Sequence, residues 1–141
     1  MLWDSTQARD FATLFFGVFA DSSRRLTYIN CGHNPPVCLR RDGTVEWLEA
    51  TATVLGAFDR WECSLGRLQL SPGDVLVAYS DGVTEAARGT EQLGEEGLLD
   101  ILRRHVNAPP DEVISAILDR VQEFSAGEQS DDLTLLVARV R

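Results

Sequence analysis

Two acidic segments interrupt apolar runs of the sequence, and their side chains are the ones best suited to catalysis or metal binding. Asp81 directly follows the run at 75–80 and precedes Gly82, and Asp131 stands with a second aspartate just before the run at 133–140. If these runs form antiparallel strands of one sheet, the end of the first and the start of the second lie at the same edge. Asp81 and Asp131 would then converge there.

Converging carboxylates need a cation or a shared proton. Two carboxylates about 4 Å apart repel each other by roughly 4 kcal/mol at an effective dielectric constant near 20. The chain has only 2 histidines, and its 3 cysteines, Cys31, Cys38 and Cys63, lack the paired spacing of a zinc site. Oxygen ligands therefore favour Mg²⁺ or Mn²⁺. The alternative stays open that Asp81 begins an ordinary turn and that Asp131 lies in a solvated loop.

Three further side chains allow both a chemical and a structural interpretation. His33 could donate a proton near a phosphate group, but we favour a histidine that is hydrogen-bonded within its own loop. Glu85 could act as a base beside a metal-bound water or could pair with Arg88, and the sequence does not separate these roles. Ser80 lacks the Gly-x-Ser-x-Gly turn that presents a nucleophilic serine, which argues against a serine hydrolase.

The elements that must position these residues are strands first and helices later. Runs rich in β-branched and aromatic residues predict strands at 13–20, 26–31, 36–40, 45–48, 64–70, 74–79 and 133–140. Turn residues between the first four predict an antiparallel meander, and Ser71-Pro72-Gly73 predicts a hairpin that joins the next two. The final run is apolar enough for a central strand.

A helical period begins near Gln92 and predicts two helices. One face of the first helix carries Leu98, Ile101, Leu102 and His105, and Pro109-Pro110 ends this helix. The second helix begins near Asp111 and buries Val113, Ile114, Ile117, Leu118, Val121 and Phe124. Strands followed by helices in 141 residues predict a single α+β domain.

Composition disfavours several classes of protein. Asp+Glu 22 against Lys+Arg 13 gives a formal net charge of -9, which disfavours a nucleic-acid partner. The most apolar early stretch, residues 11–20, is too short to span a bilayer, and we expect neither a signal peptide nor a membrane anchor. The unpaired cysteines indicate a reduced, cytoplasmic protein.

Six short motifs follow one another along nearly the whole chain. They are Phe11-Ala12-Thr13, Asn30-Cys31-Gly32-His33-Asn34-Pro35-Pro36, Leu55-Gly56, Pro72-Gly73-Asp74, Ser80-Asp81-Gly82-Val83-Thr84-Glu85-Ala86 and Asp131-Asp132-Leu133-Thr134. Each motif is weak alone, but their order and spacing together are specific. On these motifs the sequence resembles the SpoIIE/RsbU branch of the metal-dependent serine/threonine phosphatases.

The resemblance implies an antiparallel β-sandwich flanked by helices, with a binuclear Mn²⁺ or Mg²⁺ centre at one edge of the sheets. It assigns Asp81, Gly82 and Asp131 to the metal site and makes Asp81 and Asp131 the catalytic residues. The implied activity is hydrolysis of phosphoserine or phosphothreonine on a protein by a metal-activated water, without a covalent phosphoenzyme. The implied substrate is a phosphorylated anti-anti-sigma regulator in bacterial signalling.

One segment of the family has no counterpart in this sequence. Nothing upstream of Phe11 resembles the family's earlier Asp-x-x-Gly-His-Gly segment, whose aspartate bridges both metals. The resemblance therefore implies the C-terminal part of a phosphatase domain, incomplete at its N-terminus, with weak metal binding. Such a chain leaves the strand at 13–20 with an open edge, which predicts a homodimer. The alternative function is a non-catalytic, partner-binding remnant of such a domain.

Overall fold

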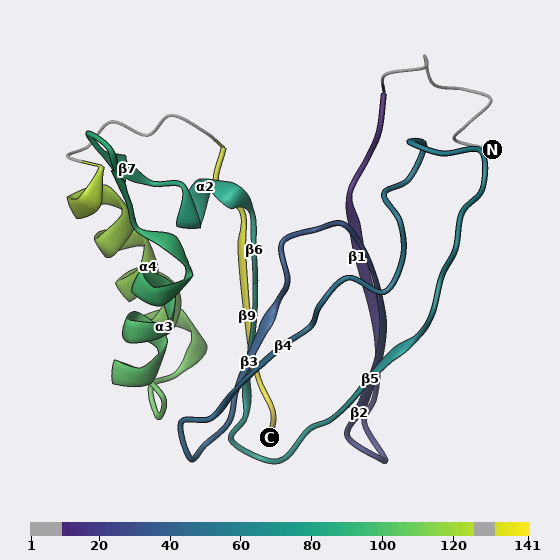
Figure 1. Ribbon diagram of the computed structural model, residues 1–141. Coiled ribbons are helices and arrows are strands. Elements are labelled where there is room, and N and C mark those ends of the chain that lie inside the picture. The colour runs from purple at the N-terminus through teal and green to yellow at the C-terminus, as the bar shows by residue number, and fades with distance from the viewer. Residues whose placement is uncertain (1–9, 126–131) are drawn as a thin grey trace. The chain divides into compact units, whose positions relative to one another are not determined.

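The computed structural model describes residues 10–125 and 132–141 of the chain (Figure 1). These residues fall into two compact units that interleave in the sequence. Within the described residues, the first unit comprises 10–35 and 47–71, and the second comprises 36–46, 72–125 and 132–141.

A three-stranded antiparallel sheet forms the base of the first unit. Its order is β1 (Leu14–Ala20), β2 (Arg25–Cys31) and β5 (Gly66–Gln69). Leu26 and Leu68 lie opposite each other in β2 and β5, and both are buried. Strand β1 lies at an edge of this sheet, and most of its residues are exposed.

Tyr28 packs over the middle of this sheet. Its ring stacks on that of Phe15, with centroids 5.5 Å apart and an interplanar angle of 27°. The same ring covers Gly66, where a Cβ atom would lie 2.2 Å from the nearest ring carbon. Glycine is therefore needed at this position of β5, because any side chain would displace the ring.

The second unit contains a four-stranded sheet in the order β4 (Val45–Trp47), β3 (Val37–Leu39), β6 (Val75–Tyr79) and β9 (Leu135–Arg139). Strand β6 is antiparallel to both β3 and β9. Alternate residues of β6 are buried, namely Val75, Val77 and Tyr79. This alternation is expected of a strand whose two faces have different surroundings.

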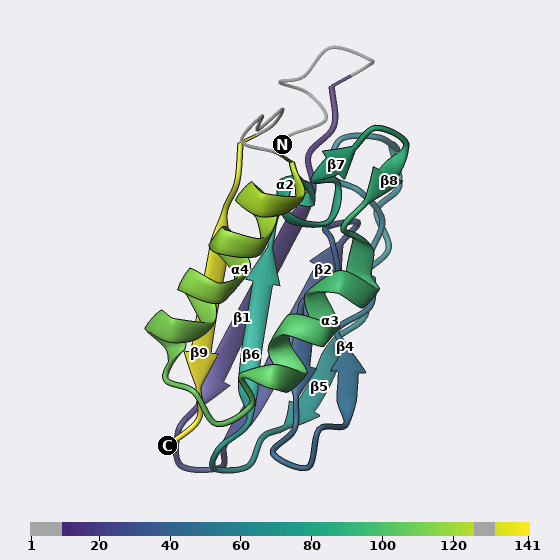
Figure 2. The same ribbon diagram turned by 90° about the vertical axis from the view of Figure 1, so that its left-hand side faces the viewer.

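Two helices cover one face of the four-stranded sheet (Figure 2). Helix α3 spans Gly94–Arg104 and helix α4 spans Pro110–Phe124. Their buried residues recur at helical spacing and are Leu98, Leu99, Ile101, Leu102, Val113, Ile117 and Val121. The helices are therefore amphipathic, as their sequence period predicts. Among the described residues, no helix has the length and apolar character needed to cross a membrane.

Three short elements connect β6 to α3. Helix α2 spans Asp81–Thr84, and strands β7 (Ala87–Arg88) and β8 (Glu91–Gln92) form a small antiparallel hairpin after it. The sequence pattern did not predict these elements, because segments of two to four residues carry too little periodicity.

Arg139 in β9 ties the connection between the helices to the sheet. Its guanidinium donates to the carbonyl of Gly73 at 3.0 Å, to that of Val106 at 2.9 Å and also to that of Ala108. Val106 and Ala108 lie between α3 and α4, where carbonyls have lost their helical partners. The Arg139 guanidinium, which carries five donors, supplies hydrogen bonds to these two carbonyls. It also bonds the carbonyl of Gly73 in the turn before β6.

The α+β class with antiparallel sheets is confirmed, and so are the neighbours β1 and β2 and the neighbours β3 and β4 of the predicted meander. The meander is wrong at the step from β2 to β3, and the predicted hairpin of β5 and β6 is wrong. Strands β2 and β3 lie in different sheets, and so do β5 and β6. The N–H of Leu70 still donates to the carbonyl of Arg24, next to β2 of the first sheet, whereas the N–H of Gly73 donates to the carbonyl of Val140, next to β9. Turn residues predict a reversal of the chain. Which sheet each flanking segment joins depends on the strand to which it is hydrogen-bonded.

The prediction of a central C-terminal strand is also wrong for the described residues. Strand β9 pairs only with β6 and ends the order of its sheet. Leu136 is 54% exposed, and Ala138 on the same face is exposed as well. An apolar run indicates a strand, but it does not by itself distinguish an interior position from an edge.

A buried ion pair anchors the start of β6. Asp74 is 2% exposed and accepts a hydrogen bond from the guanidinium of Arg40, which also donates to the carboxylate of Glu46 at 2.7 Å. A carboxylate buried to this degree is costly unless it is paired and hydrogen-bonded, as it is here by Arg40. The aspartate of the Pro72-Gly73-Asp74 motif therefore has a structural role.

Cys38 in β3 is expected to make the protein less stable at alkaline pH. Its thiol is fully buried, and burial raises its pKa from 9.0 to about 11. Because the unfolded thiol ionises first, the free energy of unfolding should be at its full value below pH 9 and fall by roughly 2 to 3 kcal/mol as the pH rises towards 11. Urea denaturation at about pH 8 and about pH 11 measures this change.

Two cysteine variants control for other groups that titrate in this range. Cys38→Ala should lose this part of the alkaline destabilisation, whereas Cys63→Ala should keep it, because Cys63 is exposed. Equal alkaline losses in the unmodified chain and in Cys38→Ala would contradict the prediction.

Candidate metal centre

Ser80 joins the end of β6 to the chain that enters β9. Its N–H donates to the carbonyl of Thr134 at 2.9 Å, and its Oγ accepts from the N–H of Thr134 at 2.8 Å. The Ser80 hydroxyl also donates to the carbonyl of Asp132 at 3.4 Å. These bonds continue the antiparallel register of β6 and β9. The strand arrangement expected for the two acidic segments is therefore confirmed for the described residues.

Gly82 allows the two segments to approach closely. A Cβ atom at this position would lie 2.6 Å from the carbonyl oxygen of Asp132. That oxygen belongs to the backbone, so a side chain at Gly82 would push residues 132–134 away from the start of α2. Gly82 itself is buried, whereas Asp81, the first residue of the helix, is exposed.

Oxygen donors gather at this edge of the sheet. Asp81 and Asp132 are both exposed there. Asp131 lies outside the described residues, so the metal-binding roles of Asp81, Gly82 and Asp131 stay predictions. Within 10–125 and 132–141, no group of three or more His, Cys, Asp or Glu side chains could hold a metal ion. The residues fit Mg²⁺ or Mn²⁺ in the kind of donor, but those described are too few to enclose an ion.

Glu85 and Arg88 have different partners. Glu85 is exposed at the C-terminal end of α2, where its N–H donates to the carbonyl of Asp81 at 2.8 Å. Arg88 donates to the carbonyl of Glu123 at 2.9 Å, and its guanidinium lies 5.5 Å from the centroid of the Phe124 ring. Arg88 thus links the β7–β8 hairpin to the last turn of α4. A role for Glu85 as a base stays a prediction.

Asn30, rather than His33, is the centre of its loop. Asn30 is fully buried, its Nδ2 donates to the carbonyl of Leu48 at 2.9 Å, and its Oδ1 accepts from the N–H of His33 at 2.9 Å. The Asn30 N–H also donates to the Oγ1 of Thr51 at 3.0 Å. His33 is half-buried, and its Nδ1 is 2.9 Å from the carbonyl of Asn34. These local bonds support the loop interpretation of His33.

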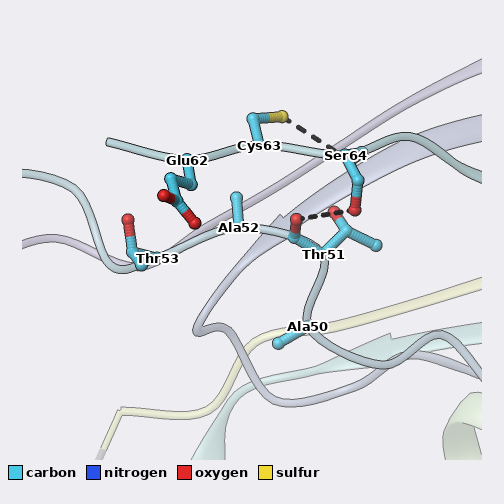
Figure 3. A pocket seen from close by; sticks show the side chains of 7 residues that line it. All are labelled: Ala50, Thr51, Ala52, Thr53, Glu62, Cys63 and Ser64. Carbon is cyan, nitrogen blue, oxygen red and sulfur yellow. Dashed lines mark hydrogen bonds between the residues drawn. The ribbon is translucent and has the colours of Figure 1, made fainter. Parts of the chain in front are cut away.

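A cavity of about 380 Å³ in the first unit is a second candidate site (Figure 3). It is lined by Ala50, Thr51, Ala52, Thr53, Glu62, Cys63 and Ser64. The lining segments run side by side, since the N–H of Thr53 donates to the carbonyl of Glu62 at 3.3 Å. The lining contains a carboxylate and a thiol but no basic side chain, so it does not suit a phosphate group.

The described residues thus form an α+β fold in which antiparallel sheets, a pair of covering helices and oxygen donors beyond β6 occur together. The chain belongs to the SpoIIE family, because the family Stage II sporulation protein E (SpoIIE) matches it over residues 1–141. The resemblance that the motifs carry is thereby confirmed.

Two curated relatives show how much of a longer protein the chain represents. It is 33% identical over 132 residues to Protein IcfG of Synechocystis, covering 89% of this chain and 20% of that protein. It is 29% identical over 136 residues to Phosphoserine phosphatase RsbU of Bacillus subtilis, covering 96% of this chain and 41% of RsbU. The chain therefore spans less than half the length of these two relatives.

The phosphatase domain of SpoIIE from Bacillus subtilis, in a crystal presoaked with manganese, has the same fold. Its TM-score is 0.71 at 23% sequence identity, and the match covers 91% of this chain and 56% of that one. The α+β architecture is thus that of a PP2C-type phosphatase domain.

Proposed function

We propose that the chain supplies the C-terminal part of a single metal-dependent protein serine/threonine phosphatase domain that acts in bacterial regulatory signalling. One observation carries the proposal. In a member of the SpoIIE family, Ser80, which lies between β6 and Asp81, is hydrogen-bonded to Asp132 and Thr134, directly after the predicted ligand Asp131. The name of RsbU as a phosphoserine phosphatase supports a phosphoserine substrate.

In this proposal, Asp81 and Asp131 hold Mn²⁺ or Mg²⁺, with Gly82 at the same edge. Two such ions supply a water of lowered pKa and offset charge on the phosphoryl oxygens. The chain's own residues position the two segments that carry Asp81 and Asp131. Ser80 fixes the spacing of the two segments through its hydrogen bonds, and Gly82 leaves room for the backbone of Asp132.

The substrate we propose is a phosphorylated anti-anti-sigma protein in the cytoplasm. Because the chain carries a formal net charge of -9, a phosphoprotein would approach against a repulsive field without a cation. Cations held at the exposed Asp81 would invert that field locally and direct the phosphoserine to this edge.

The second candidate function is a non-catalytic, partner-binding remnant of the phosphatase. The scarcity of metal ligands among residues 10–125 and 132–141 favours it, because an ion with few protein ligands is held weakly. The two candidates differ in what they require of Asp81, since only the phosphatase needs its carboxylate.

A chimera in which this chain replaces the matching 136 residues of RsbU tests the proposed activity. Phosphate release from a phosphoserine-containing anti-anti-sigma protein should occur with Mn²⁺ and stop when the metal is chelated. Circular dichroism shows whether the chimera is folded. A folded chimera that binds the phosphoprotein without releasing phosphate would support the non-catalytic candidate instead.

A further inference from the structure

One short segment, which runs from the end of β6 to β7, makes hydrogen bonds on both sides of the connection between α4 and β9. On the β9 side, two hydrogen bonds of 2.9 and 2.8 Å join Ser80 to Thr134. On the α4 side, the Nη2 of Arg88 donates to the carbonyl of Glu123 at 2.9 Å. Asp81 lies between these two contacts in the sequence.

The last turn of α4 gives Arg88 a firm attachment. The guanidinium of Arg88 lies 5.5 Å from the centroid of the Phe124 ring, a distance at which a cation is attracted to an aromatic face. Ser125, which follows this turn, is buried, and its Oγ donates to the carbonyl of Val121 at 2.8 Å. Basic side chains commonly bond the last carbonyls of a helix, so a simple helix cap is one interpretation of Arg88.

The other end of the link, the β7–β8 hairpin, is fixed close to α2. The N–H of Leu93 donates to the carbonyl of Ala86 at 2.8 Å and closes the base of the hairpin, and both residues are buried. Val83 in α2 is fully buried. Figure 2 shows α2, β7 and the last turn of α4 at the same end of the second unit. Arg88 therefore joins the end of α4 to the part of the chain that carries Asp81.

We propose that Arg88 is a positioning residue for the metal site, an inference that rests on the proposed phosphatase function. Its guanidinium has no acceptor and cannot be a ligand. It holds the last turn of α4 against the segment that carries Asp81, and Ser80 holds the chain that enters β9 against the same segment. Both stretches that flank residues 126–131 are thereby fixed relative to Asp81. The predicted ligand Asp131 directly precedes the second stretch.

Arg120 provides a matched comparison. Its guanidinium lies 5.6 Å from the centroid of the same Phe124 ring, and its carboxylate partner Glu123 is three positions further along the same helix. Arg88 and Arg120 are both exposed and bring the same charge to the same ring. In the part of the chain that the structure describes, the contacts of Arg120 stay within α4, whereas those of Arg88 cross from β7 to α4.

Titration of the RsbU chimera with Mn²⁺ measures the positioning effect. Arg88→Gln should raise the Mn²⁺ concentration for half-maximal phosphate release about tenfold, as loss of a residue behind the ligands commonly does. The rate at saturating Mn²⁺ should stay within about twofold, because the ligands are unchanged. Arg88→Lys should restore most of the affinity, since an ammonium group can still donate to the carbonyl. Arg120→Gln should leave the Mn²⁺ requirement unchanged, and an equal effect of both glutamine variants would overturn the proposal.

Amide hydrogen exchange of the 141-residue chain without metal tests the link separately from activity. In Arg88→Gln, the N–H groups of Ser125 and Thr134 should both exchange at least about fivefold faster, because both flanks are loosened. Faster exchange of Ser125 alone would make Arg88 a local helix cap and would overturn the positioning role. A chimera without Mn²⁺-dependent turnover would contradict the proposed function, whereas the exchange of Thr134 would still decide the role of Arg88.

Discussion

Asp81→Asn is expected to lower the Mn²⁺-dependent turnover of the RsbU chimera by at least about a hundredfold. The amide keeps the size of the side chain but removes the negative charge that holds a hard cation. Asp111→Asn makes the same change of charge at the exposed start of α4, at the other end of the second unit from α2 (Figure 2). Initial rates of phosphate release at saturating Mn²⁺ should be nearly unchanged in this control.

The 141-residue chain alone provides a second measurement of the same site. It is expected to bind Mn²⁺ with at most millimolar affinity and to turn over near background, because two predicted carboxylate ligands, Asp81 and Asp131, cannot fill the coordination shells of two ions. Calorimetry should show that Asp81→Asn and Asp131→Asn each weaken this binding further. Tight Mn²⁺ binding and turnover that survive Asp81→Asn would show that the metal lies elsewhere.

Asn30→Ala is expected to lower the free energy of unfolding by about 3 kcal/mol. Alanine leaves the carbonyl of Leu48 and the N–H of His33 without the partners that Asn30 provides in a buried position. Unsatisfied groups of this kind cost about 1 to 3 kcal/mol each. Urea unfolding followed by tryptophan fluorescence measures the loss.

His33→Ala is the matched variant in the same loop. His33 is half-buried, and its ring bonds the carbonyl of the next residue, so removal of the ring should cost about 1 kcal/mol or less. In the chimera, turnover per folded molecule should stay within roughly tenfold, which is less than the loss of a general acid. A loss of stability larger than that of Asn30→Ala would assign the structural role to His33 after all.

The pairing of β6 with β9 could be predicted from the sequence, because its signals are strong and local. Each run is apolar, and the acidic residues stand at the end of one run and at the start of the other. Antiparallel pairing is the arrangement that brings these ends together. The roles of Ser80 and Gly82 depend on the backbone of residues 132–134, at least 50 positions away, so no local pattern could reveal them.

The burial of Asn30 and the change of sheet between β5 and β6 could not be predicted either, because both depend on residues distant in the sequence. An asparagine followed by glycine and two prolines indicates a loop, whereas the burial of Asn30 depends on the carbonyl of Leu48. A polar residue at the end of an apolar strand was the available signal. The turn at 71–73 is likewise local, but sheet membership depends on Arg24 on one side and on Val140 on the other.

The guanidinium of Arg139 determines how the second unit can open. It bonds carbonyls in the turn before β6 and in the connection between α3 and α4 from a position in β9. The helices therefore cannot swing away from the sheet at that end unless the two charge-assisted bonds to Val106 and Ala108 break. Because the same guanidinium also bonds the turn at Gly73 from its place in β9, we expect helices, turn and strand to exchange their amide hydrogens as one cooperative unit.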